Sequence, residues 1–266
     1  MYDGCQVVPM YDLPSDLSSL IKALYDGSNF MHRNFEDFIY LVGVLRLSTK
    51  YLIAHLRKEA IRCLAETWSY TLEGHDAMVN KAVTAPSMDG LTYPYVHPLH
   101  ILNLANELNI QIVIPSAMYF LSLYPLSDIL RGDHPKLQVA HQSKLSSSLS
   151  PTDIGAYTLM FQYRLKVILD FMREERIPAS LCRNETCQRG FQKQASRLLR
   201  SWQTRTGPIF FVVQAINAAE EEPYICEICR RKYRREANEL RQKIWLELPS
   251  VIGLSSWEGL IAADLS

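Results

Sequence analysis

The stretch that decides the fold is NFEDFIYLVGVLRLSTKYL, residues 34–52. Asn34 is a residue type that favours the N-cap of a helix, and the acidic Glu36 and Asp37 suit its first turn. Apolar residues then recur at the spacing of one helix face: Phe38, Leu41, Val42 and Leu45. The stretch therefore predicts an amphipathic helix with one buried face.

The flanking segments add a short strand and two more helices. Residues 6–10, QVVPM, have the composition of a strand. Residues 17–24 carry leucine and isoleucine at helical spacing, and Gly27 follows where a glycine ends a helix. Residues 56–64 form another amphipathic run. One strand and three helices are too few to close a core, so further units must follow.

The rest of the chain is patterned as helices. Shorter helical pieces fill residues 72–130, and residues 131–149 form a polar linker or long surface loop. Ser150 then provides an N-cap for a long helix that ends near Arg176. Later helices are predicted over three ranges: 188–202, 208–219 and 229–248. The expected fold is mainly α, with units at residues 1–70, 71–149 and 150–266.

Composition excludes some function classes. Of 266 residues, 28 are Lys or Arg and 28 are Asp or Glu, so no global field attracts nucleic acid or an anionic membrane. No run reaches the ~20 apolar residues that span a bilayer. The N-terminus lacks the pattern of a secretory signal, so we expect a cytoplasmic or nuclear protein without membrane contact. There, cysteines are free or metal-bound rather than disulfide-bonded.

Two segments resemble the BTB/POZ domain. Residues 20–27, LIKALYDG, are similar to a segment at the end of a central helix in that family. Residues 41–52, LVGVLRLSTKYL, look like the family's leucine-rich helix, and residues 56–64 look like the helix after it. The resemblance is closest to BTB proteins of higher fungi, of the basidiomycete type, in which a His-Pro-Leu like that at His97 heads a later helix.

The resemblance implies a partial α/β remnant in residues 1–70, because nothing before Gln6 supplies the family's opening strand and dimerising helices. Homodimerisation through the usual BTB surface is therefore not expected. The implied function is non-enzymatic protein binding, as an adaptor that contacts the cullin of a ubiquitin ligase or as a transcriptional co-regulator. The implied partner-binding residues lie on or beside the helix quoted above: Phe35, Phe38, Leu41, Leu45 and Tyr51.

The cysteines give the sharpest local signal. Cys182 and Cys187 form a C-x4-C pair, and Cys226 and Cys229 form a C-x2-C pair. Each pair precedes or starts a predicted helix, where backbone N–H groups stabilise thiolates. Four thiolates satisfy a closed tetrahedral zinc site, so the pattern predicts one structural zinc ion. The alternative is four ordinary cysteines; the remaining two, Cys5 and Cys63, are interpreted as buried or incidental.

A basic run, RRKYRR at residues 230–235, supports the alternative function. Beside a zinc knuckle it is typical of a nuclear protein that contacts nucleic acid, here through residues 226–241. The neighbouring glutamates instead indicate a solvated helix face, which the zero net charge favours, so nucleic acid is not the expected partner. We find no phosphate-binding glycine loop, nucleophile elbow or zinc-protease motif, and we expect no enzymatic activity.

Overall fold

The first three helices begin and end at the signals seen in the sequence. Helix α2 (Phe35–Lys50) starts at Asn34, whose side chain accepts a hydrogen bond from the backbone N–H of Asp37 at 2.9 Å. Helix α1 (Pro14–Asp26) ends at Gly27, which has a φ of 81°, a conformation that glycine adopts without strain. Helix α3 (Ala54–Thr67) follows the predicted 56–64 run. These three predictions are confirmed.

The computed structural model describes residues 3, 9–88, 90–139, 143, 145–173, 182 and 185–266. The middle of the chain forms four further helices and one 3-10 turn: α4 (Leu72–Thr84), α5 (Pro98–Leu108), α6 (Ile114–Leu121), α7 (Leu126–Arg131) and η1 (Pro135–Leu137). Within the described residues there is no strand, only an isolated bridge between Met88 and Leu91. The mainly α prediction is confirmed; residues 6–8 of the predicted strand lie outside the described residues.

The C-terminal half contains five helices: α8 (Pro151–Arg173), α9 (Glu185–Ser201), α10 (Pro208–Glu221), α11 (Glu227–Val251) and α12 (Trp257–Leu265). Ser150 caps α8 as predicted, because its Oγ accepts a hydrogen bond from the Asp153 N–H at 3.1 Å. The sequence analysis did not predict α12, which Ser256 caps by accepting from the Gly259 N–H. The predicted end near Arg176 lies outside the described residues.

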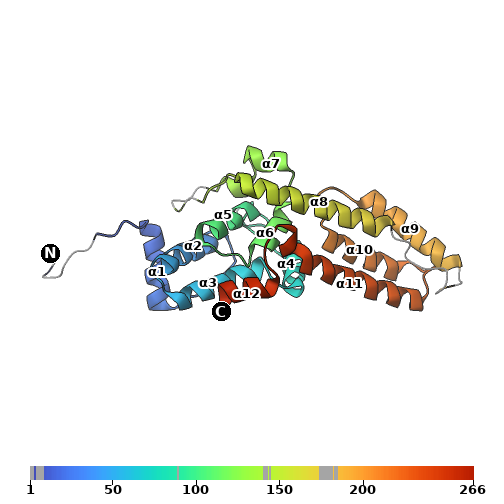
Figure 1. Cartoon of the computed structure of the whole chain (residues 1–266), viewed down its shortest axis with the longest axis horizontal. Coiled ribbons are helices and arrows are strands. Elements are labelled where there is room, and N and C mark those ends of the chain that lie inside the picture. Colours follow the sequence, from blue (N-terminus) through green and yellow to red (C-terminus); the bar gives the residue numbers. More distant parts are fainter. Residues whose placement is uncertain are drawn as a thin grey trace.

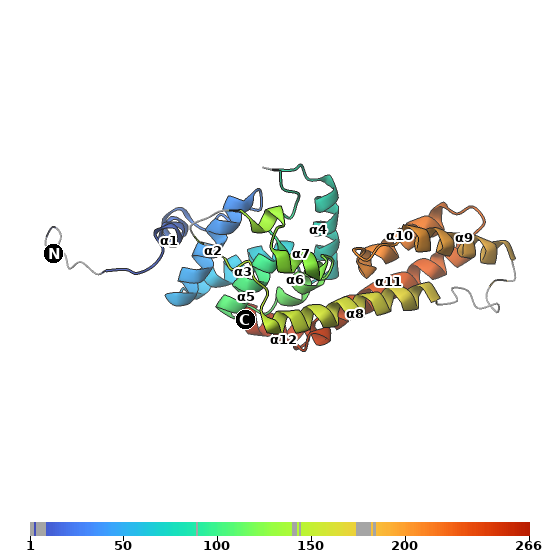
Figure 2. The ribbon, with the colours of Figure 1, turned by 90° about the horizontal axis from the view of Figure 1, so that it is seen from above.

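Two large hydrophobic cores, with two smaller clusters beside α1 and α4, organise an elongated molecule (Figure 1). The first core contains residues mainly from α2 to α6 and α12, with others from α7, α8, α10 and α11, and it draws on all three predicted units. The second core lies between α8, α9, α10 and α11, which run side by side in both ribbon views (Figure 2). We call the described residues between 168 and 237 the tip and the rest the main body. The boundaries at 70 and 149 stay predictions.

Helices α8 and α11 join the two regions because each contributes to both cores. On α8, Tyr157 belongs to the first core and Phe171 to the second; on α11, Trp245 belongs to the first and Tyr233 to the second. Arg164 of α8 is fully buried at the junction. Its guanidinium donates to the backbone oxygens of Ser122 and of the loop before α10, which ties that loop to the main body.

Helix α12 returns the chain to the main body. The indole Nε1 of Trp257 donates to the backbone oxygen of Trp245 at 2.9 Å, and the two rings stack. The buried Asp264 carboxylate accepts from the backbone N–H groups of Gln111 and Ile112, both at 2.7 Å. These contacts satisfy two donors in the turn between α5 and α6, so α12 closes the first core.

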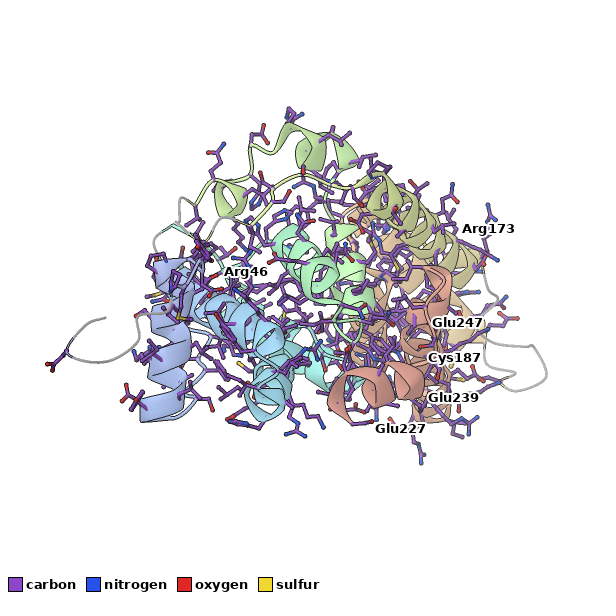
Figure 3. The ribbon with its side chains drawn as sticks, turned by 60° about the vertical axis from the view of Figure 1, so that its left-hand side comes forward. Arg46, Arg173, Cys187, Glu227, Glu239 and Glu247 are labelled. Atoms are coloured by element: carbon purple, nitrogen blue, oxygen red, sulfur yellow. The ribbon has the colours of Figure 1, made fainter. Side chains whose placement is uncertain are left out.

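The predicted linker packs on the main body. In the described part of 131–149, Leu137 and Leu145 are buried in the first core. The Asn103 side chain donates to the backbone oxygen of Ser146 at 2.6 Å. Arg46, on the opposite side of the molecule from Cys187 (Figure 3), donates to Ser143 Oγ at 2.7 Å. Of the two forms predicted, the packed surface loop describes this segment.

Candidate metal centre

The four cysteines of the predicted zinc site meet in the tip. Cys187 lies in the first turn of α9, Cys226 is the N-cap of α11 and Cys229 lies in its first turn. Cys182 precedes α9 in the chain. The four Sγ atoms all lie within 4.8 Å of one another. We call these residues the four-cysteine cluster; Figure 3 labels Cys187 among the C-terminal helices.

The close approach of α9 to the chain before α11 brings the two pairs together. Gly190 permits it, because a Cβ at this position would lie 2.8 Å from the side chain of Ile225. The backbone N–H of Cys226 then donates to Cys187 Sγ at 3.2 Å. The buried Glu222, at the end of α10, pairs with Lys193 of α9 at 3.2 Å. Packing between α9 and the α10–α11 connection therefore positions the cluster.

The thiols differ in their readiness to ionise. Cys187 and Cys229 are buried, whereas Cys182 and Cys226 are partly exposed. The backbone of Cys229, at the start of α11, lowers the pKa of Cys226 to about 7. Burial raises the pKa of both Cys187 and Cys229 above the usual thiol value. A bound divalent ion stabilises the sulfur atoms of the cluster as thiolates.

The donor set and its spacing fit a metal ion. Tetrahedral zinc with Zn–S bonds of about 2.3 Å places its sulfur atoms about 3.8 Å apart. None of the observed Sγ separations exceeds 4.8 Å, so none is more than about 1 Å longer than that value. All four cysteines are free thiols. The cluster can therefore hold a metal ion, with no ligand position left over for a substrate.

The predicted partner-binding set requires a correction. Phe38, Leu41 and Leu45 are buried in the first core, so their side chains do not face a partner in this structure. Helix α2 lies between α1, α3 and α5, which cover it on several sides. Phe35 is half-buried against the same core, and Tyr51 is exposed. The partner-binding set came from the resemblance to BTB/POZ domains, whereas the periodic pattern predicted the buried face that the structure shows.

The basic run on α11 is paired with acidic side chains. Arg231, Lys232 and Arg235 each lie within ion-pair distance of a glutamate one turn away on α11. Arg234 pairs with Glu220 of α10, and the Arg230 guanidinium donates to the backbone oxygen of Glu222 at 2.7 Å. Tyr233 is buried in the second core. The arrangement is that of a solvated helix face with local charge balance.

Sequence reasoning missed a buried polar group in the same region as the cluster. Gln194 of α9 is buried, and its amide donates to the Ala215 backbone oxygen of α10. The same amide lies 3.4 Å from the Tyr233 hydroxyl of α11. Gln194 thus links three tip helices, although a lone glutamine in a polar helix gives no sequence signal. Cys63 is buried, as predicted, and Cys5 lies outside the described residues.

Compared with known proteins, the chain matches no family model, no curated protein and no solved structure. The BTB/POZ resemblance therefore stays a prediction from the quoted motifs. Within the described residues, no helix is both long enough and apolar enough to cross a membrane. The four-cysteine cluster is therefore interpreted from the geometry of the chain's own residues.

Proposed function

We propose that this chain is a non-catalytic protein-binding protein whose tip is held together by one structural zinc ion. The observation that carries the zinc is the convergence of four free thiols within 4.8 Å. Four protein ligands form a closed tetrahedral site, the arrangement of structural rather than catalytic zinc. The ion cross-links α9 to α11 and so fixes the far end of the tip.

The zinc is tested by metal content and by a cobalt spectrum of the full-length protein. We expect the protein to show the intense near-ultraviolet absorption of several thiolate–cobalt bonds when Co²⁺ replaces zinc. Cys187→Ser and Cys229→Ser should each weaken this absorption and reduce affinity for the ion. With one equivalent of Co²⁺ added, Cys63→Ser, which changes a buried thiol outside the cluster, should leave this absorption intact. A spectrum without thiolate absorption in the folded wild-type protein would refute the proposal.

Protein binding is supported by an uncovered apolar face on α1. Leu20 and Ala23 bury one side of this helix, whereas Ile21, Leu24 and Tyr25 on the other side are exposed. Leu17, one turn before Ile21, is half-buried against the inner side of the helix. An apolar stripe at the end of a molecule (Figure 1) is typical of a surface that a protein partner covers. We place the partner surface here rather than on α2.

The resemblance to BTB/POZ proteins makes a cullin the first partner to test and a transcriptional regulator the second. We expect a purified cullin N-terminal region to bind the wild-type chain and to lose binding to Ile21→Glu and Leu24→Glu. Val83→Glu provides a matched control, because Val83 is an exposed apolar residue on α4. Equal cullin binding by all four proteins would show that α1 is not part of the interface. No binding by any of them would show that the cullin is not a partner.

Nucleic-acid contact through residues 226–241 has weaker support. The cations of the basic run are engaged by glutamates or by a backbone carbonyl, so binding phosphates would require breaking those contacts. A true phosphate-binding surface loses affinity steeply as salt rises. We expect fluorescence polarisation with labelled duplex DNA to show no specific binding at physiological salt, and unchanged weak binding after Arg231→Gln and Arg235→Gln.

A further inference from the structure

We propose that His32, Cys63 and Glu66 form a second zinc site, on the main body, with three protein ligands and a free fourth coordination position. None of these residues belongs to the four-cysteine cluster, so a result for or against one proposed site does not decide the other. The three ligand atoms lie within 4.8 Å of one another. We call these residues the three-ligand site.

Two elements of the first core bring the three residues together. His32 lies in the connection between α1 and α2. Cys63 and Glu66 lie on α3, three residues apart, so their side chains share one face of the helix. Imidazole, thiolate and carboxylate are all common zinc ligands, and three such ligands are the usual protein contribution to an open zinc site.

The separations match those around a tetrahedral zinc ion. The Nε2 atom of His32 lies 3.2 Å from Cys63 Sγ and 3.5 Å from Glu66 Oε2. Zinc bonds of about 2.3 Å to sulfur and about 2.0–2.1 Å to nitrogen and oxygen place the corresponding atoms about 3.5 and 3.3 Å apart. Each observed separation is within a few tenths of an ångström of that geometry, so the ion requires little rearrangement.

The convergence on one ring nitrogen argues against a Cys–His nucleophile. In such a pair, the thiol contacts one imidazole nitrogen and the carboxylate orients the ring through the other. Here Cys63 and Glu66 both approach Nε2. A neutral imidazole has one proton to offer at Nε2, which can satisfy only one of the two acceptors well. A cation between the three atoms satisfies all of them.

The three side chains differ in exposure, which gives the site a buried ligand and a path by which an ion can enter. Cys63 is buried, the His32 side chain is 22% exposed and the Glu66 side chain is 71% exposed, so an ion enters past the carboxylate. The Cys63 thiol proton passes to solvent when sulfur binds the ion. A small cavity of about 30 Å³ beside the site is lined by His32, Thr67 and Tyr93, among others. That volume has room for about one water molecule. The exposed Glu66 side chain leaves the ion accessible to solvent water, the ligand expected at the fourth position.

The test is a metal titration of the full-length protein whose four-cysteine cluster is already filled with zinc. Added Zn²⁺ is followed by competition with a chromophoric chelator, and added Co²⁺ by absorption. We expect a second, weaker equivalent with the spectrum of a single thiolate–cobalt bond. Glu66→Gln and His32→Ala should weaken this equivalent at least about tenfold, the lower end of the loss seen when even outer-shell partners are removed.

A matched control separates the site from its surroundings. His55→Ala changes an exposed residue of the same α3 helix and should leave the second equivalent unchanged. Glu66→Gln is the decisive variant because its exposed side chain contributes little to folding. A wild-type protein that takes up no ion sensitive to Glu66→Gln or His32→Ala overturns the proposal. If the four-cysteine cluster alone fails, a single equivalent remains that is sensitive to Glu66→Gln and insensitive to Cys187→Ser.

Discussion

The main body and the tip are both helical, but different interactions stabilise them. Among the described residues, the first core contains 36 buried residues and the second contains 13. The first core is closed by α12 through Asp264, and the main body buries further polar groups such as His75 and His97. The second contains two of the four clustered cysteines and a buried glutamine. A core as small as the second contributes on its own only about 3–5 kcal/mol to the free energy of unfolding. Natural domains with cores of this size add a metal ion or disulfides.

The two regions also differ in the kind of metal site that their packing allows. In the tip, each cysteine pair lies at or before the start of a helix, and the N-terminal ends of α9 and α11 lie close together, so all four ligands come from the protein. In the main body, α3 presents Cys63 and Glu66 to a loop at the surface, and one coordination position stays open. If both sites bind zinc as proposed, the ion in the tip should exchange slowly and the ion in the main body readily.

Removal of the metal is the change with the largest expected effect on this comparison. We expect a strong chelator to unfold the tip selectively, because structural zinc in small zinc-binding peptides contributes on the order of 10 kcal/mol and the second core is small. Hydrogen exchange should accelerate in α9, α10 and the first turns of α11. Exchange in α2, α5 and α6 should stay slow, since the first core does not depend on the cluster.

Two controls sharpen the chelation experiment. The Glu66→Gln background removes any contribution of the three-ligand site to the main body. In Cys187→Ser, the tip should exchange rapidly before chelation and change little afterwards. Uniform acceleration across both regions would show that the tip and the main body unfold as one unit. Unchanged exchange in the tip after complete metal removal would show that the second core is sufficient by itself.

Leu45→Ala has the next largest expected effect, and it acts on the other side of the comparison. Leu45 is fully buried in α2, so its truncation leaves a cavity and should lower the free energy of unfolding of the main body by about 2–5 kcal/mol. Leu24→Ala, the same change on the exposed face of α1, should cost no more than about 0.5 kcal/mol. Urea unfolding followed by tryptophan fluorescence measures both.

The Leu45 experiment also separates core from partner surface. If Leu45 were a surface residue kept for a partner, its truncation would resemble Leu24→Ala in stability and would differ only in binding. Metal content should be unchanged in both variants, because neither residue touches a cysteine of the tip cluster. A loss of zinc from Leu45→Ala at temperatures where the protein stays folded would contradict the independence of the two regions.

Local signals in the sequence predicted the helices well. The helix boundaries at Gly27, Asn34 and Ser150 follow from caps, which involve residues only a few positions apart. The four-cysteine cluster was predicted for a related reason, since each pair is local and thiols have few structural roles in a reducing compartment. Helix α12 was missed because it is short and follows α11 after a brief turn.

Tertiary contacts set the limits of that prediction. Leucines recur at helical spacing on both α1 and α2, yet α2 is central and α1 is terminal, so only one of the two is covered on all sides. Residues 31 positions apart, His32 and Cys63, meet only through the packing of a loop against α3. No periodic pattern or residue spacing in the sequence indicates this contact, so the three-ligand site could be found only from the structure.

Acid is expected to have the smallest and most selective effect of the three changes. His75 of α4 lies in the main body between the rings of Phe120 and Trp245, with centroid distances of 5.2 and 5.0 Å. Burial, and then the charge of Arg241, lower its pKa to about 3. The unfolded chain binds this proton near pH 6.5 and the folded chain does not, so stability falls as pH drops from about 6.5 towards 3.

His75→Phe should therefore reduce the acid sensitivity of the main body. The variant removes about 1.4 kcal/mol of destabilisation per pH unit below 6.5, or about 2 kcal/mol at pH 5 relative to pH 7. His97, whose pKa burial also lowers to about 3, keeps part of the wild-type slope in place. Urea unfolding at pH 7 and pH 5 measures the difference, with the exposed His55→Phe as the matched control.

The same acid titration distinguishes how the tip and the main body lose stability at low pH. In the tip, protons compete with the metal for thiolates, so acid releases the ion and His75→Phe has no effect there. In the main body, acid acts through buried imidazoles, and the substitution flattens the loss. Hydrogen exchange at pH 5 should therefore show α5 and α6 protected by His75→Phe while α9 and α10 behave as in the wild type. Equal protection of both regions would mean that acid destabilises the tip through the main body rather than through its own cysteines.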